Sequence, residues 1–296
     1  MKINRRRFLS ISASFTATFA AAAETQRWHG RAFGSDVSLS IRGPEQAANE
    51  AISEARLLIR QAEKQFNLYD PESALVQLNR TGVLRPSVHF LQLMKSADLA
   101  YRLSEGLFDP SVQPLWNSAT QGGDPADVMH LVGWDKVQSN AARVALAPGQ
   151  ALTFNGIAQG FATDLVSERL RALGFTQSLV NIGEYRGVGG PWTLGLADPS
   201  HGLLDAHTFE DSAVATSSPL ATPIGDHGHI FLPTGQASDD RRPWSTVSVE
   251  AETATLADAL STGLVWADMR LVEQVRQFPA VRRVTLVDEN GDLLNL

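Results

Sequence analysis

The 296-residue sequence contains no cysteine, and this absence excludes several kinds of chemistry. Disulfides, thiolate metal ligands, CxxC redox pairs and a cysteine nucleophile all need the missing side chain, and so does a lipidated mature N-terminus. An excess of positive charge is also absent, because 25 Lys and Arg stand against 32 Asp and Glu. The formal charge of −7 disfavours a general nucleic-acid binder. With 43% hydrophobic residues the chain can nevertheless bury a large core, so we expect a globular protein.

The first 23 residues are typical of an export signal. Lys2 and the run Arg5-Arg6-Arg7-Phe8-Leu9 precede a mildly apolar segment that ends in alanines before Glu24. The arginines match twin-arginine signals, and the many serines and threonines make the segment a poor membrane anchor. We predict cleavage after Ala23 and a periplasmic location. Cleavage removes four positive and no negative charges, so the formal charge changes from −7 to −11. An ordinary Sec signal with clustered arginines is the alternative.

The mature chain, residues 24–296, alternates strand-like and helix-like patterns without a repeat or a linker that would separate domains. Helical spacing of apolar residues predicts helices from Pro44 to Phe66 and over 87–104, 155–173, 253–266 and 271–278. Short apolar or alternating runs predict strands at 28–41, 144–146, 151–154, 179–182, 192–196, 213–216, 229–232 and 247–249, and a closing hairpin around Asn290-Gly291. We expect an α+β fold, a single domain of interleaved mixed sheets and helices.

The segment Ala257-Asp258-Ala259-Leu260-Ser261-Thr262 is the first candidate for chemistry. Asp258 and Thr262 are four residues apart and therefore share one face of the expected helix. A carboxylate and a hydroxyl in this arrangement suit Mg²⁺, which takes few protein ligands and completes its shell with water and substrate phosphate. The simpler structural alternative is a capping or solvated Asp258 and a Thr262 that bonds to its own helix.

Three other segments combine special backbone residues with polar ones. Asn155-Gly156-Ile157-Ala158-Gln159-Gly160 stands where a helix begins, which suits either a bound phosphate or metal, or close helix packing. The loop from Gly106 to Pro114 suits a ring system or a ribose, although Asp109 before Pro110 is equally typical of a turn. His227 and His229 flank Gly228, and such a pair of histidines suggests a zinc site, but no third ligand is near in sequence. Hydrolase, Walker and dinucleotide-binding motifs do not occur in the sequence.

Taken in this order, these segments resemble the motifs of the ApbE family of flavin transferases, across nearly the whole mature chain. The matching segments are Phe66–Asn79, Gly106–Val112, Asn155–Gly160, Val214–Ser218 and Ala257–Thr262. The turn Asn181-Ile182-Gly183-Glu184, the twin-arginine signal and the missing lipobox cysteine resemble the NosX branch, the flavin donors of nitrous oxide respiration. The resemblance implies a T-fold-like domain.

The resemblance also implies an enzyme that transfers FMN from FAD to a Ser or Thr hydroxyl of a partner flavoprotein and releases AMP. The expected Mg²⁺ ligands are the Gly156 carbonyl and the side chains of Asp258 and Thr262. The expected FAD contacts are Phe33, Tyr69, Leu107, Phe108, Asp109, Thr153, Gln159 and Ile230. Among these groups Asp258 is expected to be catalytic, and His229 is expected to assist proton removal from the acceptor hydroxyl. The expected acceptor carries a Ser/Thr flavinylation motif, as in a NosR-type membrane protein, and no nucleic acid or stable membrane anchor is expected.

Several positions depart from the family pattern. Thr153 replaces an acid, Gln159 replaces the usual Lys or Glu, and Phe33-Gly34-Ser35 replaces Met-Gly-Thr. In the segment from His229 to Gly235 an acid is replaced and one residue is lost relative to His-Ile-x-Asp-Pro-Arg-Thr-Gly. Two alternatives therefore stay open: a catalytically weak FAD-binding maturation or delivery factor, and an FAD pyrophosphatase that releases AMP without an acceptor.

Overall fold

The computed structural model describes residues 24–222, 228–233 and 243–296. The predicted export signal, His227, Thr234 and Gly235 lie outside these ranges. Within them, no helix combines the length and the apolar character that a membrane crossing requires.

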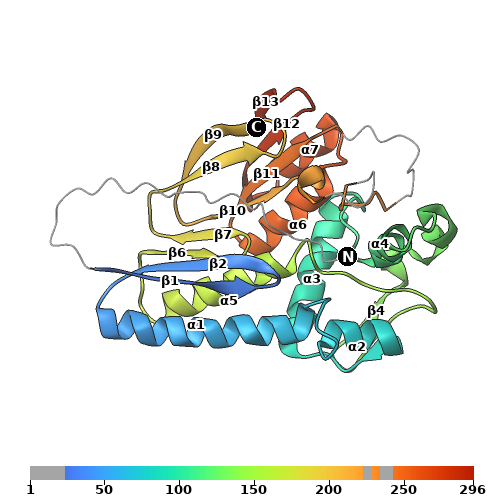
Figure 1. Cartoon of the computed structure of the whole chain (residues 1–296), viewed down its shortest axis with the longest axis horizontal. Helices are drawn as coiled ribbons and strands as arrows, with labels where there is room; N and C mark the ends of the chain where they lie inside the picture. Colours follow the sequence, from blue (N-terminus) through green and yellow to red (C-terminus); the bar gives the residue numbers. More distant parts are fainter. Residues whose placement is uncertain (1–23, 223–227, 234–242) are drawn as a thin grey trace.

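A central sheet of eight strands forms the body of the molecule (Figure 1). In spatial order its strands are β1 (Thr25–Ala32), β2 (Ser35–Arg42), β6 (Ser178–Asn181), β7 (Tyr185–Val188), β10 (Ala213–Ser217), β11 (Thr246–Ala251), β12 (Val281–Val287) and β13 (Leu293–Asn295). A separate hairpin pairs β8 (Trp192–Asp198) with β9 (Gly202–Phe209), and a small sheet has the order β3 (Val83–Leu84), β5 (Val144–Ala145), β4 (Gln138–Ser139). Mixed sheets were expected, whereas every strand pair in the described ranges is antiparallel.

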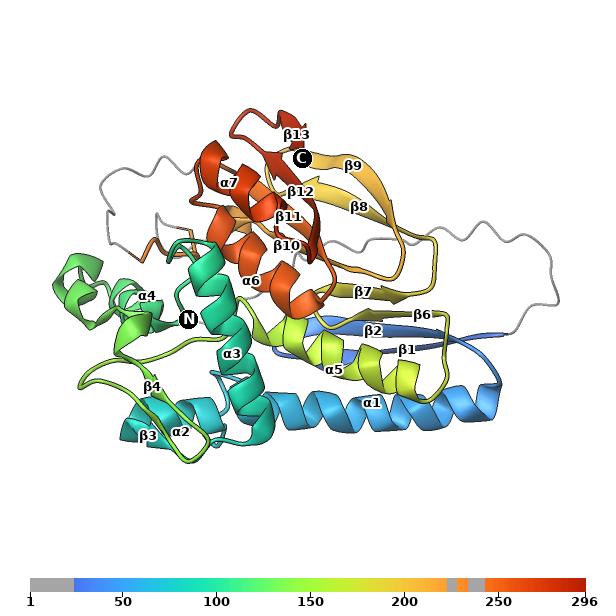
Figure 2. The same cartoon turned by 180° about the vertical axis from the view of Figure 1, so that it is seen from behind.

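Helices cover one face of the central sheet. In Figure 2, α5 (Ala158–Ala172), α6 (Ala254–Leu264) and α7 (Met269–Arg276) lie in front of the strands, and α1 (Glu45–Phe66) runs below them beside β1. Helix α3 (Val88–Leu103) runs steeply across the ends of α1 and α6. The remaining short helices are α2 (Ala74–Thr81), α4 (Gln113–Thr120) and the 3-10 turns η1 (Pro110–Val112), η2 (Pro125–Leu131), η3 (Trp134–Lys136) and η4 (Pro219–Ala221).

The hydrophobic core has two main parts, one on each side of the contact between α5 and α6. Around α1, α3 and α5 the rings of Phe66, Phe90, Phe154 and Phe161 pack at tilted or edge-on angles with centroids 5.6–6.0 Å apart. Around α6, β11 and β12 the core is aliphatic. Residues 155–160 and 257–262, which the sequence analysis singled out, lie where these two parts meet.

The long helices agree with the sequence predictions because periodicity and capping residues point the same way. Ser87 Oγ accepts a hydrogen bond from Phe90 N at the start of α3, and Thr253 accepts one from Leu256 N at the start of α6. Pro44 precedes α1, where its missing N–H costs nothing.

Three strand predictions were wrong. Residues 28–41 form two strands, because Phe33 and Gly34 take positive φ angles of 50° and 77° and turn the chain back. Residues 151–154 form no strand, since the Asn79 side chain takes both the N–H and the carbonyl of Leu152, each at 2.8 Å. Residues 229–232 form a bend and irregular chain rather than a strand. Strands β7 and β9 were missed, because β7 contains Arg186-Gly187 and β9 begins with Gly202.

Candidate active site

Helices α5 and α6 approach each other closely at Gly160. A Cβ atom at this position would lie 2.3 Å from the Ala254 carbonyl oxygen, so only glycine allows the approach. The Gly160 N–H then donates to Asp258 Oδ2 at 2.9 Å. The first turn of α5 and the middle of α6 are therefore joined by the carboxylate that the sequence predicts as a metal ligand.

The three expected Mg²⁺ ligands come together at this junction. Asp258 is 4% exposed and Thr262 lies one turn further along α6. Gly156 precedes α5, and a Cβ on it would lie 2.7 Å from Thr262 Oγ1, so its backbone rests directly against the Thr262 side chain. The i, i+4 spacing on α6 predicts that Asp258 and Thr262 lie together. The contact between Gly156 and Thr262 adds the Gly156 backbone to this pair.

The chemistry of this donor set fits a hard divalent cation. Asp258 Oδ2 accepts from Gly160, and no donor among the described residues reaches Oδ1. The pKa of Asp258 is raised to about 7, mainly by burial; the Gly160 hydrogen bond opposes the rise and the Asp164 charge adds to it. A bound cation would hold this carboxylate ionised. Within the described ranges no three His, Asp or Glu side chains form a metal-binding cluster, so carbonyl and hydroxyl oxygens would have to complete the set.

Glu184 is a part of this junction to which the sequence analysis gave no site role. It stands in the turn between β6 and β7, and its Oε2 accepts from Thr216 N at 3.3 Å. Burial and the nearby Asp258 charge raise the pKa of Glu184 well above its ordinary value. The Asn181–Glu184 motif was the available signal, but only the tertiary structure places its carboxylate near Asp258.

Gln159 carries a buried side-chain amide at the start of α5. Among the residues that the structure describes, its Nε2 has no hydrogen-bond partner, and it lies next to Gly183, where a Cβ would be 2.2 Å from that nitrogen. A buried N–H₂ group without a partner costs free energy unless a ligand accepts from it. The position at the start of α5, whose cap residue makes no side-chain hydrogen bond, suits an anionic or carbonyl-bearing ligand such as FAD.

The loop Leu107-Phe108-Asp109 lies against the end of α6. Gly263 permits this approach, because a Cβ there would lie 2.9 Å from Phe108 N. The Asp109 carboxylate accepts from Ser111 N at 2.7 Å, Ser111 Oγ at 2.6 Å and Trp134 N at 3.3 Å. Burial raises the pKa of Asp109, and these hydrogen bonds oppose the rise. The Asp109 carboxylate thus fixes the shape of the loop that borders Gly263.

The other expected FAD contacts fall into two groups, one beside the junction and one at the end of α1. Thr153 N donates to the Pro110 carbonyl at 2.8 Å, which ties the segment before α5 to the 107–109 loop. Ile230 packs against the core around α6. Phe33 and Tyr69 gather at the C-terminal end of α1: Phe33 N donates to Glu63 Oε1 at 2.9 Å, and Tyr69, shortly after α1, is 49% exposed.

His229 is held by the segment that follows β10. Its backbone N–H and its ring Nδ1 both lie within hydrogen-bond distance of the Pro219 carbonyl, at 3.2 and 2.8 Å. A carbonyl only accepts, so Nδ1 carries the proton and Nε2 of the neutral ring is an acceptor. This tautomer is the one that a proton-accepting role requires. His227, the other histidine of the alternative zinc pair, lies outside the described residues.

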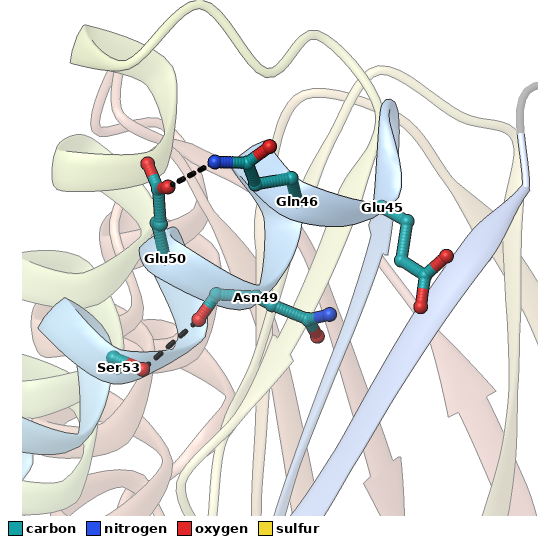
Figure 3. A pocket seen from close by; sticks show the side chains of 5 residues that line it. All are labelled: Glu45, Gln46, Asn49, Glu50 and Ser53. Atoms are coloured by element: carbon teal, nitrogen blue, oxygen red, sulfur yellow. Dashed lines mark hydrogen bonds between the residues drawn. The ribbon is translucent and has the colours of Figure 1, made fainter.

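A surface hollow elsewhere on the molecule is unrelated to this junction. It has a volume of about 450 Å³ and is lined by Glu45, Gln46, Asn49, Glu50 and Ser53 at the beginning of α1 (Figure 3). The side chains bond mainly along their own helix, as Gln46 Nε2 does to Glu50 Oε1 at 3.1 Å and Ser53 Oγ to the Asn49 carbonyl at 3.0 Å. None of the sequence-predicted site residues lines it.

Known proteins resemble this chain over a range that includes the segments of the junction. Residues 33–281 match the ApbE family. A Chlamydia pneumoniae protein named FAD:protein FMN transferase is 27% identical over 232 residues, which cover 70% of this chain and 73% of the relative. A Vibrio cholerae protein of the same name is 28% identical over 243 residues, 70% of either chain.

Solved structures share the fold. The Flavin Transferase ApbE from Vibrio cholerae superposes with a TM-score of 0.79 at 21% identity, over 92% of this chain and 97% of its own. The ApbE protein of Thermotoga maritima gives a TM-score of 0.80 at 22% identity, over 92% and 96%. These likenesses confirm the expected single α+β domain. Since the family match spans most of the chain and includes the segments that form the α5–α6 junction, this chain belongs to the ApbE family.

Proposed function

We propose that this protein transfers FMN from FAD to a Ser or Thr hydroxyl of a partner flavoprotein, with Mg²⁺, and releases AMP. The observation that carries the proposal is the meeting of Asp258, Thr262 and the Gly156 backbone beside the start of α5. Family membership and the name FAD:protein FMN transferase borne by its relatives support the choice of FAD and of a protein acceptor.

The reaction exchanges the phosphoanhydride bond of FAD for a phosphoester bond to the acceptor. The acceptor oxygen bonds to the FMN-side phosphorus, the bond from that phosphorus to the oxygen bridging to AMP breaks, and the acceptor proton passes to a base. When bound, Mg²⁺ neutralises the charge of the pyrophosphate. Asp258, Thr262 and Gly156 would hold it, and the Gln159 amide would donate to FAD.

Proton removal is assigned to His229. Because Nδ1 donates to the Pro219 carbonyl, the ring is fixed in the tautomer whose Nε2 can accept a proton. The Pro219 contact also holds the ring to the segment that leaves β10.

We further propose that the enzyme works in the periplasm on a NosR-type respiratory flavoprotein. The twin-arginine pattern of residues 5–9 supports export, and the Asn181–Glu184 turn supports the NosX branch. Cell fractionation tests the location. We expect the protein in the periplasmic fraction that is released when spheroplasts are prepared, and we expect replacement of Arg5 and Arg6 by lysine to abolish its export.

A transfer assay tests the activity. Purified mature protein, FAD and Mg²⁺ are incubated with an acceptor peptide that contains an Asp-Gly-x-Ser/Thr-Gly-Ala-Thr motif. We expect covalent flavin fluorescence on the peptide with an equal amount of AMP, and no product with EDTA or with Asp258→Ala. Glu273→Gln, which removes an exposed carboxylate on α7, is the matched control and should transfer normally.

Two results would contradict the proposal. Release of AMP without a labelled peptide would identify a pyrophosphatase. Stoichiometric FAD binding that Asp258→Ala leaves unchanged, without either product, would identify a delivery factor. A known transferase run in parallel shows that the peptide is competent.

A further inference from the structure

The end of β10 brings a chain of hydroxyl groups to the cation site. Ser217 Oγ lies 2.8 Å from Ser261 Oγ and 3.3 Å from Thr262 Oγ1, both on α6. Ser261 Oγ in turn donates to the Asp258 carbonyl oxygen at 3.0 Å. The side chain of one expected metal ligand is thus in contact with a strand residue that the proposed reaction does not use.

Strand geometry directs Ser217 toward α6. Successive side chains of a strand point to opposite faces. Thr216 and Ser218 accordingly face the other side of the sheet, where Thr216 Oγ1 donates to Ser248 Oγ at 2.9 Å and Ser218 Oγ lies 2.8 Å from Thr246 Oγ1. Ser217 is the one hydroxyl of this run that meets the helix.

Counting protons fixes the direction of each bond in the chain. A hydroxyl has one hydrogen and two lone pairs. Ser261 donates its single hydrogen to the Asp258 carbonyl. Because Ser261 has no second hydrogen, Ser217 must be the donor in the bond between Ser217 and Ser261. Ser217 then has no hydrogen left, and its contact with Thr262 must be donated by the Thr262 hydroxyl. The lone pairs of Thr262 Oγ1 are left pointing away from its proton.

We propose that Ser217 is a positioning residue of the cation site, which accepts the Thr262 proton and thereby turns the Thr262 lone pairs toward a divalent cation. The inference rests on the proposed Mg²⁺ dependence. Without Ser217, the Thr262 hydroxyl would be free to donate elsewhere, for example to a carbonyl of its own helix, and would then present a different side to the cation. The partners that orient metal ligands typically contribute 10- to 100-fold to metal affinity.

The test measures binding of Mg²⁺ itself. The purified mature protein, without FAD, is titrated with MgCl₂ by calorimetry, and the Mg²⁺ concentration for half-maximal transfer is measured separately. For Ser217→Ala we expect about 10-fold weaker binding and a matching rise in that concentration, with kcat at saturating Mg²⁺ close to the wild type. Ser217→Thr keeps the hydroxyl and should restore binding. Ser218→Ala removes the neighbouring hydroxyl on the opposite face and should bind Mg²⁺ as the wild type does.

The outcomes separate this inference from the proposed function. Thr262→Ala is the positive control: if neither it nor the wild type shows a Mg²⁺-dependent signal, the proposed Mg²⁺ dependence fails. If Thr262→Ala weakens binding but Ser217→Ala does not, or if Ser217→Thr is as weak as Ser217→Ala, the positioning role is refuted while the proposed function stands. A fall in kcat for Ser217→Ala at unchanged Mg²⁺ affinity would also refute it. Urea unfolding in EDTA shows whether each variant is folded.

Discussion

Replacing Asp258 by Asn should stabilise the metal-free protein while abolishing its response to Mg²⁺. Asp258 is 4% exposed, and its burial raises the pKa from 3.8 to about 7. The folded state therefore binds the carboxyl proton more tightly than the unfolded state does. The free energy of unfolding must then fall as the pH rises from about 4 through 7, because ionisation occurs first in the unfolded chain.

The size of the effect follows from the two pKa values. One pKa unit corresponds to about 1.4 kcal/mol, so the difference between 3.8 and about 7 costs the folded protein up to about 4 kcal/mol above pH 7. Asparagine carries no charge and keeps an oxygen that can accept from Gly160 N. Asp258→Asn should therefore match the wild type only at or below about pH 3.8, and exceed its stability by about 1.5 kcal/mol at pH 5 and by about 4 kcal/mol at pH 8.

Urea unfolding in EDTA at pH 5 and pH 8 measures this difference. Addition of Mg²⁺ at pH 8 should stabilise the wild type, because only the folded state presents the site, and should leave Asp258→Asn unchanged. An Asp258→Asn protein that is less stable than the wild type at both pH values would refute the reasoning. It would mean that the ionised carboxylate stabilises the α5–α6 junction in the metal-free protein, instead of destabilising it until a cation binds.

Three further predictions concern stability and packing. The Asp198 side chain has no exposed surface, and although burial raises its pKa, hydrogen bonds from hydroxyl and backbone donors lower it to about 2. Asp198→Asn should cost about 2 kcal/mol at neutral pH in urea unfolding, and the wild type should lose this contribution as the pH falls from 3.8 toward 2. Gly160→Ala places a Cβ 2.3 Å from the Ala254 oxygen and should lower the free energy of unfolding by about 1–3 kcal/mol or more, seen as a lower melting temperature. Gly156→Ala places a Cβ 2.7 Å from Thr262 Oγ1 and 2.9 Å from Thr262 Cγ2, so rotation of this β-branched side chain does not relieve the clash; the variant should melt at a lower temperature in EDTA and lose the stabilisation by Mg²⁺.

Local sequence signals predicted the helices and one pair of site residues. The apolar period and the caps Ser87 and Thr253 place α3 and α6 to within a residue or two. Since side chains four apart on a helix share a face, Asp258 and Thr262 could be paired before any tertiary contact was known. Short strands were predicted less well, because Leu152 bonds to a side chain of α2 instead of to a strand, and no local pattern reveals that choice.

The sequence by itself therefore determined the chemistry that this protein can use: without cysteine it depends on oxygen and nitrogen groups, and α6 carries a carboxylate and a hydroxyl in ligand spacing. The tertiary structure alone decided which groups complete the site. Glu184 reaches it from the turn between β6 and β7, 74 residues before Asp258, and Ser217 reaches it from the end of β10, 41 residues before Asp258. Gly156 reaches it through the α5–α6 contact. Helix spacing is set within one turn of backbone, whereas the meeting of a strand end, a turn and two helices is set by non-local packing, which no window of sequence contains.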